Sequence, residues 1–331
     1  MAVFTSVTPE EVDGWLQNFR IGKLRKLEGI ASGIENTNYF VSTDSAEYGG
    51  EFVLTIFEKL TNEQLPFYLE FMRALADHAI EVPRPIPDAG GAILHSLKGK
   101  PCALATRLPG GFELDPTPEH CRQVGTALAQ LHLAGDDYQR ARPELMHDNP
   151  RGLPWWLETV DIVAPHLPPA LQLLLREEVR AQAQFAATPA YAKLKRGPVH
   201  ADLFRNNVLF AGTREAPRLG GFIDFYFAGV DTWLFDLAVT VNDWCIDLAT
   251  GALDAARTQA MLAAYGEQRA YTQAEQEAWD MMLRAAALRF WMSRLYDYYM
   301  PREAETLTPH DPTHFERVLR LRRLRHATLP A

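Results

Sequence analysis

A Leu-Pro-Gly-Gly break at residues 108–111 divides the chain into two stretches with different patterns. Before it, short runs rich in β-branched and aromatic residues are separated by turn residues, as in 38–43 and 51–58. After it, apolar residues recur mainly at helical spacing. A chain of 331 residues is also too long for one small core. We therefore expect a smaller lobe over residues 1–107 and a larger lobe over 108–331.

The first lobe has the pattern of an antiparallel sheet around one helix. Tyr48-Gly49-Gly50 supplies turn residues for a hairpin between the first two strands. Thr61 to Gln64 has the pattern of a capping box, so a helix should follow and end before the proline-rich stretch 82–87. Two more short strands are expected over 92–95 and 101–106.

The second lobe is predicted to be mainly helical. The run Asp115-Pro116-Thr117-Pro118 is a helix start signal, and further helices are expected over 171–185, 255–265 and 279–300. One hairpin, with strands over 207–210 and 220–225, interrupts the helices. The five arginines from Arg317 to Arg325 favour a helix with a solvated face. The expected fold class is α+β, with a small antiparallel β-rich N-lobe and a larger mainly helical C-lobe.

Composition argues against several classes of protein. The formal charge of −9 disfavours nucleic acid as a partner, because nucleic acid is bound mainly by lysine and arginine. The three cysteines lie far apart, so neither a disulfide framework nor a cysteine zinc site is expected. The N-terminal residues do not have the pattern of a secretory signal, and no apolar run is long enough to span a membrane. We expect a cytoplasmic protein without a membrane partner.

The segment 200–207, HADLFRNN, is the most informative in the chain. Asp202 is followed five residues later by Asn207 and then by a strand, which is the spacing of a kinase catalytic loop. In such a loop the carboxylate faces the attacking hydroxyl, and the amide oxygen faces a magnesium ion that bridges nucleotide phosphates. This spacing predicts Asp202 as the catalytic residue and Asn207 as a metal ligand.

A second carboxylate follows the hairpin. Asp224 stands after an apolar strand in Ile223-Asp224-Phe225, where kinases place their other magnesium ligand. An aspartate at such a position is often only a turn former. Its order after the catalytic loop favours a joint magnesium site of Asn207 and Asp224. A zinc hydrolase site at His200 and Asp202 lacks a third ligand nearby, so we expect His200 to brace the loop.

Several segments resemble the homoserine kinase branch of the aminoglycoside phosphotransferase-like superfamily. The similar segments are residues 33–41, 119–132, 200–207, 224–228, 241–245 and 288–297. The resemblance implies a protein-kinase-like fold, ATP as co-substrate and Mg²⁺ as cofactor. It also implies phosphorylation of the side-chain hydroxyl of L-homoserine, a step of threonine biosynthesis. The expected partners are thus ATP, bound by the N-lobe, and L-homoserine, bound by the catalytic C-lobe.

The nucleotide-binding segments depart from the usual kinase pattern. Thr55 stands where the third strand of a kinase carries its phosphate-binding lysine, and the sequence does not predict a replacement. The nucleotide loop has Gly33 in place of three glycines. Asn36, Thr37 and Asn38 offer side-chain and backbone donors to phosphate, although asparagine-rich turns also serve only to close hairpins.

The expected acceptor, L-homoserine, carries a carboxylate and an ammonium, and its pocket must offer a partner to each of these groups. Arg289 and Arg294 are expected to bind the carboxylate, and Asp243 or Asp297 the ammonium. Arg294 and Asp297 are also spaced to pair with each other on a helix. Two alternatives stay open. One is a kinase similar to choline or ethanolamine kinases, and the other is a pseudokinase that binds nucleotide as a scaffold.

Overall fold

A computed structural model describes residues 4–30, 35–300 and 310–330. The chain divides into two compact units. The first comprises Met1–Pro109 and Gly221–Ile223, and the second comprises Gly110–Gly220 and Asp224–Ala331. The first unit thus takes in a short segment from beyond the Pro-Gly break, which the sequence did not predict. That these units serve nucleotide binding and catalysis remains a prediction.

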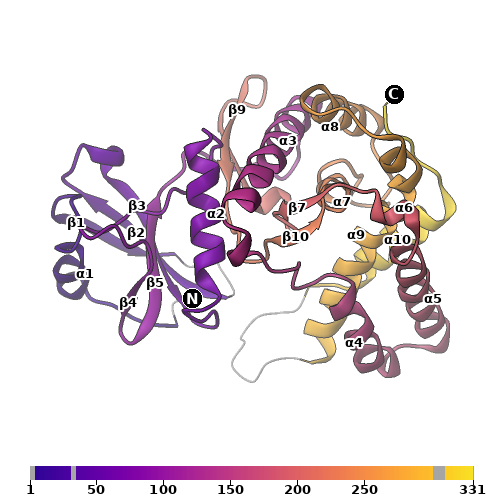
Figure 1. Ribbon diagram of the computed structural model, residues 1–331, viewed down its shortest axis with the longest axis horizontal. Coiled ribbons are helices and arrows are strands. Elements are labelled where there is room, and N and C mark those ends of the chain that lie inside the picture. Colours follow the sequence, from indigo (N-terminus) through magenta and orange to yellow (C-terminus); the bar gives the residue numbers. More distant parts are fainter. Residues whose placement is uncertain (1–3, 31–34, 301–309, 331) are drawn as a thin grey trace. The chain divides into compact units, whose positions relative to one another are not determined.

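The first unit is built on an antiparallel sheet of five strands in the order β1-β2-β3-β5-β4 (Figure 1). The expected hairpin is formed by β2 and β3, and its turn holds Tyr48, Gly49 and Gly50 at φ values of 54°, 73° and 69°. Such positive values favour glycine, which explains the two glycines. The strands are β1 (Leu24–Gly29), β2 (Asn36–Thr43), β3 (Glu51–Phe57), β4 (His95–Leu97) and β5 (Lys100–Thr106).

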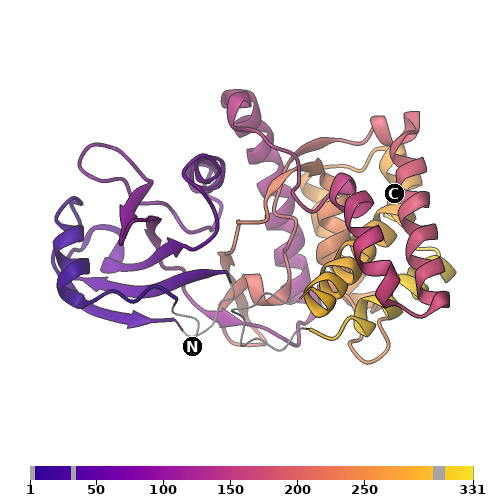
Figure 2. The same ribbon diagram turned by 90° about the horizontal axis from the view of Figure 1, so that it is seen from below.

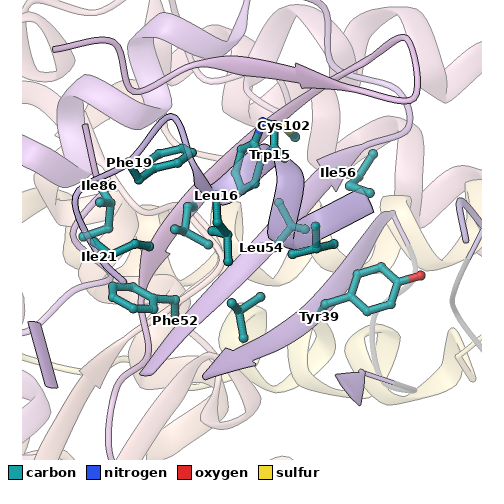
Figure 3. Packing of buried hydrophobic residues seen from close by; sticks show 13 residues of the cluster. Trp15, Leu16, Phe19, Ile21, Tyr39, Phe52, Leu54, Ile56, Ile86 and Cys102 are labelled. Carbon is teal, nitrogen blue, oxygen red and sulfur yellow. The ribbon is translucent and has the colours of Figure 1, made fainter. Parts of the chain in front are cut away.

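Helix α1 (Pro9–Leu16) covers one face of this sheet, and α2 (Leu65–Asp77) lies on the other side of the strands (Figure 1). Figure 3 shows the side chains of α1 packing with those of β2, β3 and β5 in one apolar core. Thr8 and Glu11 form a reciprocal capping box that starts α1. Tyr39 and Val41 of β2 point into this core, so the side chains that alternate with them point to the other face of the strand.

Several boundaries differ from those expected. The Gln64 side chain accepts a hydrogen bond from the Thr61 backbone at 3.1 Å, but α2 begins only at Leu65. The strand expected over 92–95 lies at His95–Leu97. The strand expected over 220–225 is β9 (Pro217–Phe222), which ends earlier because Asp224 adopts a positive φ of 64°.

The second unit is mainly helical (Figures 1 and 2). Thr117 caps α3 as its start signal predicts. Helix α3 packs so closely on α8 that a Cβ at Gly125 would lie 2.3 Å from the Met261 carbonyl oxygen. Helix α7 is buried along its whole length. The helices are α3 (Pro118–Ala141), α4 (Leu153–Val163), α5 (Pro169–Ala186), α6 (Pro189–Ala192), α7 (Trp233–Trp244), α8 (Ala255–Gln268), α9 (Gln273–Tyr299) and α10 (Thr313–Leu324).

Short strands support the loops expected to carry chemistry. Strand β8 (Val208–Gly212) lies between β6 (Gly111–Phe112) and β9. Strand β7 (Arg196–Val199) pairs with β10 (Gly229–Thr232). Residues 200–207 therefore run between β7 and β8, and residues 223–228 between β9 and β10.

The sequence suggested that the arginines of α10 form a solvated face. In the structure, not all of them are exposed to solvent. Arg322 is buried, and its Nε donates to Oδ1 of Asn242 on α7 at 2.9 Å. Arg323 pairs with Glu177 of α5 at 3.2 Å. The arginines thus attach the helix to its neighbours. Within the described parts of the chain, no helix is both long and apolar enough to cross a membrane.

Candidate active site

The loop 200–207 has an unusual backbone at its centre. Ala201 adopts a φ of 63°, which costs energy for a residue with a Cβ, and it is fully buried. His200 is also fully buried, and its Nδ1 accepts the Asp202 backbone N–H at 3.3 Å. The His200 ring lies against Phe225, with centroids 4.6 Å apart. His200 therefore lies within the loop as a bracing residue, consistent with the role expected for it.

Asp236 on α7 holds this strained backbone in place. Its two carboxylate oxygens accept the backbone N–H groups of His200 at 2.9 Å and Ala201 at 2.8 Å. His132 lies 3.0 Å from the same carboxylate, and its other ring nitrogen is 2.8 Å from the Tyr265 hydroxyl. Burial raises the pKa of Asp236, but the hydrogen bonds and charges of His132 and His200 together outweigh it, so the net pKa is lowered.

Asp236 was missed by the sequence analysis. The available signal was an aspartate inside the apolar run WLFDLAV, because a carboxylate at such a position is rarely buried without partners. His132 offered a similar signal on α3. Each partner of Asp236 is more than thirty residues away in the sequence, so a local sequence pattern does not reveal these contacts.

Asp202 lies at the centre of the loop's charged groups. Its Oδ2 accepts the Asn207 side-chain N–H at 3.1 Å, and its Oδ1 lies 3.7 Å from Nη2 of Arg289. Burial raises its pKa to about 7, and the Arg289 charge opposes this rise. The carboxylates of Asp224 and Asp243 raise it further. An acid with a pKa in this range suits proton transfer near neutral pH.

Asn207 and Asp224 present oxygen donors beside Asp202. Asn207 uses its amide nitrogen for the Asp202 backbone carbonyl at 2.7 Å as well as for the carboxylate. This contact directs the amide oxygen to the opposite side. Asp224 is close enough to raise the pKa of Asp202 by its charge. The donor set of one amide oxygen and one carboxylate fits Mg²⁺, which prefers oxygen and keeps positions for phosphate and water.

A closed protein cage for a metal does not form among the described residues, where no group of three His, Cys, Asp or Glu side chains could hold an ion. Like Ala201, Asp224 has a positive φ, so both loops of the site contain a strained non-glycine residue. Strain of this kind is concentrated at functional positions in proteins.

In the first unit, the expected nucleotide residues fall on two faces of β2. Asn38 is paired with Thr55 in register, and the Thr55 hydroxyl donates to Oδ1 of Asn38 at 2.8 Å. Asn36 and Asn38 share this face. Gly33 lies outside the described residues. A threonine and asparagine pair therefore occupies the strand position where kinases carry lysine.

Thr37 points to the opposite face of β2 from Asn36 and Asn38, and its hydroxyl is already paired there. It is fully buried, and its hydroxyl accepts the backbone N–H groups of Phe4 at 2.9 Å and Thr5 at 3.1 Å. The same hydroxyl donates to Glu58 at 2.7 Å, and Lys100 pairs with that carboxylate. The reason is the two-residue period of a strand, which separates Thr37 from its two asparagine neighbours.

Asp243 also differs from expectation. It forms a buried two-pronged ion pair with Arg205, with Oδ2 3.0 Å from Nε and Oδ1 3.2 Å from Nη2. Asp243 additionally accepts the Arg205 backbone N–H at 2.8 Å. Its carboxylate thus fixes the loop 200–207 from α7, and this positioning role takes the place of the expected ammonium contact.

The remaining acceptor residues lie on α9. Arg289 is buried, and its guanidinium lies over the Phe290 ring at 3.9 Å beside Asp202. Arg294 is further along, over Phe315 at 4.5 Å, and its Nη1 donates to the Asp311 carbonyl at 3.3 Å. Asp297 is exposed one turn later. Of the two arginines, Arg289 is the one that contacts Asp202 directly.

Comparison with known proteins identifies the family. The phosphotransferase enzyme family matches residues 26–271. A homoserine kinase of Ralstonia nicotianae is 57% identical over 97% of this chain and 96% of its own length. The chain belongs to the homoserine kinase family. Another member, from Cupriavidus necator, is 55% identical over 97% of this chain and 96% of its own length.

Solved structures of lower similarity share the fold. An amicoumacin kinase covers 96% of this chain and 92% of its own, with a TM-score of 0.67 at 16% identity. A choline kinase of Cryptosporidium parvum covers 96% of both chains, with a TM-score of 0.65 at 15% identity. These comparisons confirm the expected kinase-like fold class, an antiparallel N-terminal sheet followed by a mainly helical part.

Proposed function

We propose that this chain transfers the γ-phosphoryl group of ATP to the side-chain hydroxyl of L-homoserine, a step of threonine biosynthesis. Membership of the homoserine kinase family makes it an ATP-dependent small-molecule kinase. The observation that carries the proposal is the full-length identity above 50% to homoserine kinases of two genera. The geometry around Asp202 supports the chemistry, since a general base and two oxygen donors meet there.

Asp202 is proposed to orient the acceptor hydroxyl and to take its proton. The hydroxyl oxygen then attacks the γ-phosphorus, a new phosphorus–oxygen bond forms, and ADP leaves. Asp236 and Asp243 hold the loop by backbone hydrogen bonds on either side of Asp202. This positioning keeps the carboxylate in place during the reaction.

Asn207 and Asp224 are the residues that would hold Mg²⁺. The ion supplies positive charge that stabilises the phosphates during transfer. Asn207 contributes its amide oxygen, because its amide nitrogen is used by Asp202. In the first unit, Asn36 and Asn38 are proposed to contact nucleotide phosphate, with Gly33, three residues before Asn36 in the sequence, as a further candidate.

On the acceptor side, Arg289 is proposed to bind the substrate carboxylate beside Asp202. Arg294 adds positive charge close to Asp202 and Asp243, since those carboxylates influence its pKa. Asp297, exposed on the same helix, is proposed to receive the ammonium. A choline-type acceptor has no carboxylate and would leave the buried Arg289 without this contact.

The test is ADP release by the wild-type chain with MgATP and a panel of L-homoserine, L-serine, choline and ethanolamine. L-homoserine should give the highest kcat/KM, and choline should give little turnover. Efficient phosphorylation of choline would favour the choline kinase alternative. ADP release with none of the acceptors, despite nucleotide binding, would favour the pseudokinase alternative.

A further inference from the structure

One buried hydroxyl on α9 has no partner within the described chain. Oγ of Ser293 is shielded from solvent and makes no hydrogen bond. A helical serine usually donates to the carbonyl four residues earlier or faces water. A buried polar group without a partner destabilises a fold by about 1–3 kcal/mol, so such a group calls for an explanation.

The position of Ser293 relates it to the catalytic loop. It follows Arg289 by four residues, so both lie on one face of α9. Helical side chains lean towards the N-terminus, which directs the Ser293 hydroxyl towards the turn that carries Arg289. One turn rises about 5–6 Å. Homoserine spans roughly 5 Å between its hydroxyl and its carboxylate carbon.

The same face of α9 ends in aromatic side chains one turn further on. Tyr296 follows Ser293 by three residues, and its ring meets that of Trp155 on α4 with centroids 6.2 Å apart. Arg151 covers Trp155 at 4.3 Å. Helices α4 and α9 lie side by side at this place (Figure 1). The face thus changes from polar to aromatic at Tyr296, which lies about 10 Å along the helix beyond Arg289 and one turn beyond Ser293.

We propose that the Ser293 hydroxyl donates a hydrogen bond to the acceptor carboxylate that Arg289 pairs with, and that it is a specificity residue for amino-acid acceptors. The proposal rests on the homoserine phosphorylation proposed above. A guanidinium and a hydroxyl together supply donors in two directions, which a carboxylate with two oxygens can accept. The orphaned hydroxyl gains its partner when the acceptor binds.

Ser293→Ala separates this role from a structural one. Removing an orphaned hydroxyl leaves no donor unpaired, so the unfolding midpoint should stay the same or rise. The KM for L-homoserine should rise about tenfold to hundredfold, because a hydrogen bond to a charged group is lost. The KM for ATP should not change. Thr258→Val on α8 is the matched control, since Oγ1 of Thr258 is likewise buried without a partner.

A second acceptor identifies the group that Ser293 contacts. 3-Aminopropan-1-ol has the chain, hydroxyl and amine of homoserine but no carboxylate, and Ser293→Ala should not alter its kcat/KM. A homoserine KM within twofold of wild type in Ser293→Ala overturns the proposal. A rise in the KM of both acceptors or of ATP, or a lower unfolding midpoint, also overturns it. Failure of the wild-type chain to phosphorylate homoserine would instead overturn the proposed function.

Discussion

Asp236 accepts the backbone N–H of Ala201 at 2.8 Å, where the catalytic loop adopts its positive φ of 63°. The same carboxylate accepts the N–H of His200 and contacts His132. One buried carboxylate therefore connects a helix, the strained loop and a second helix. The loop conformation that presents Asp202 depends on this contact.

Asp236→Asn should lower both activity and stability. The amide keeps one acceptor oxygen but loses the charge and the second acceptor, so one backbone N–H is left buried without a partner. We expect the free energy of unfolding to fall by about 2 kcal/mol or more. A displaced loop should lower kcat by about 10². Urea unfolding and steady-state kinetics measure both, and a normal kcat in the folded variant would contradict the positioning role.

Stability should decrease as the pH falls below neutral. Burial, and then the charges of Arg294 and Arg317, lower the pKa of His314 to about 4. The unfolded chain, with an ordinary histidine pKa of about 6.5, binds the proton more readily. The folded state therefore loses stability as pH falls from about 6.5 towards 4.

His314→Gln should make this pH dependence weaker, because glutamine does not titrate. The comparison is the free energy of unfolding of wild type and variant between pH 7.5 and 5. Equal slopes in the two proteins would show that His314 does not contribute.

Asp224→Asn should weaken the response to magnesium. Loss of a charged oxygen ligand should raise the Mg²⁺ concentration needed for half-maximal kcat by about tenfold or more. The matched control is Asp115→Asn, an exposed carboxylate that pairs with Arg214. If both variants have the magnesium dependence of wild type, Asp224 has a structural role only.

Asn38→Ala and Thr37→Val should have different effects, although the residues are neighbours. Asn38→Ala should raise the KM for ATP about two- to tenfold, the value of one neutral hydrogen bond. Thr37→Val should instead lower stability by about 1–3 kcal/mol, because the Glu58 carboxylate and two backbone N–H groups lose a partner. A larger ATP effect in Thr37→Val than in Asn38→Ala would reverse our assignment of the two faces.

Local patterns in the sequence predicted much of the fold. The β2–β3 hairpin and the start of α3 at Thr117 depend on residues close in the chain, and both are as expected. Helix α1 and strand β1 were not predicted. β1, with the sequence LRKLEG, carries charged residues at three of its six positions, and its two partly buried leucines are three residues apart, so strand alternation is hidden.

The candidate site likewise contains residues that local patterns predicted and contacts that they did not. Asp202, Asn207 and Asp224 could be predicted as site residues because their order and spacing are typical of one chemistry, and these roles stay predictions. The contacts of Asp236 with Ala201 and of Asp243 with Arg205 join residues more than thirty positions apart, so no local pattern contains them. The two faces of β2 were, in contrast, readable from the two-residue period, which separates the Thr37 side chain from those of Asn36 and Asn38.

The central claim is that Asp202 directs phosphoryl transfer to homoserine. Phosphorus-31 NMR of L-homoserine incubated with MgATP tests it most directly, with the wild-type chain and Asp202→Asn side by side. We predict equal amounts of ADP and O-phosphorylated homoserine with wild type. The variant should form this product about 10² to 10⁴ times more slowly, at an unchanged KM for ATP. Inorganic phosphate in place of the phosphorylated product, or near-normal product formation by the variant, would contradict the account.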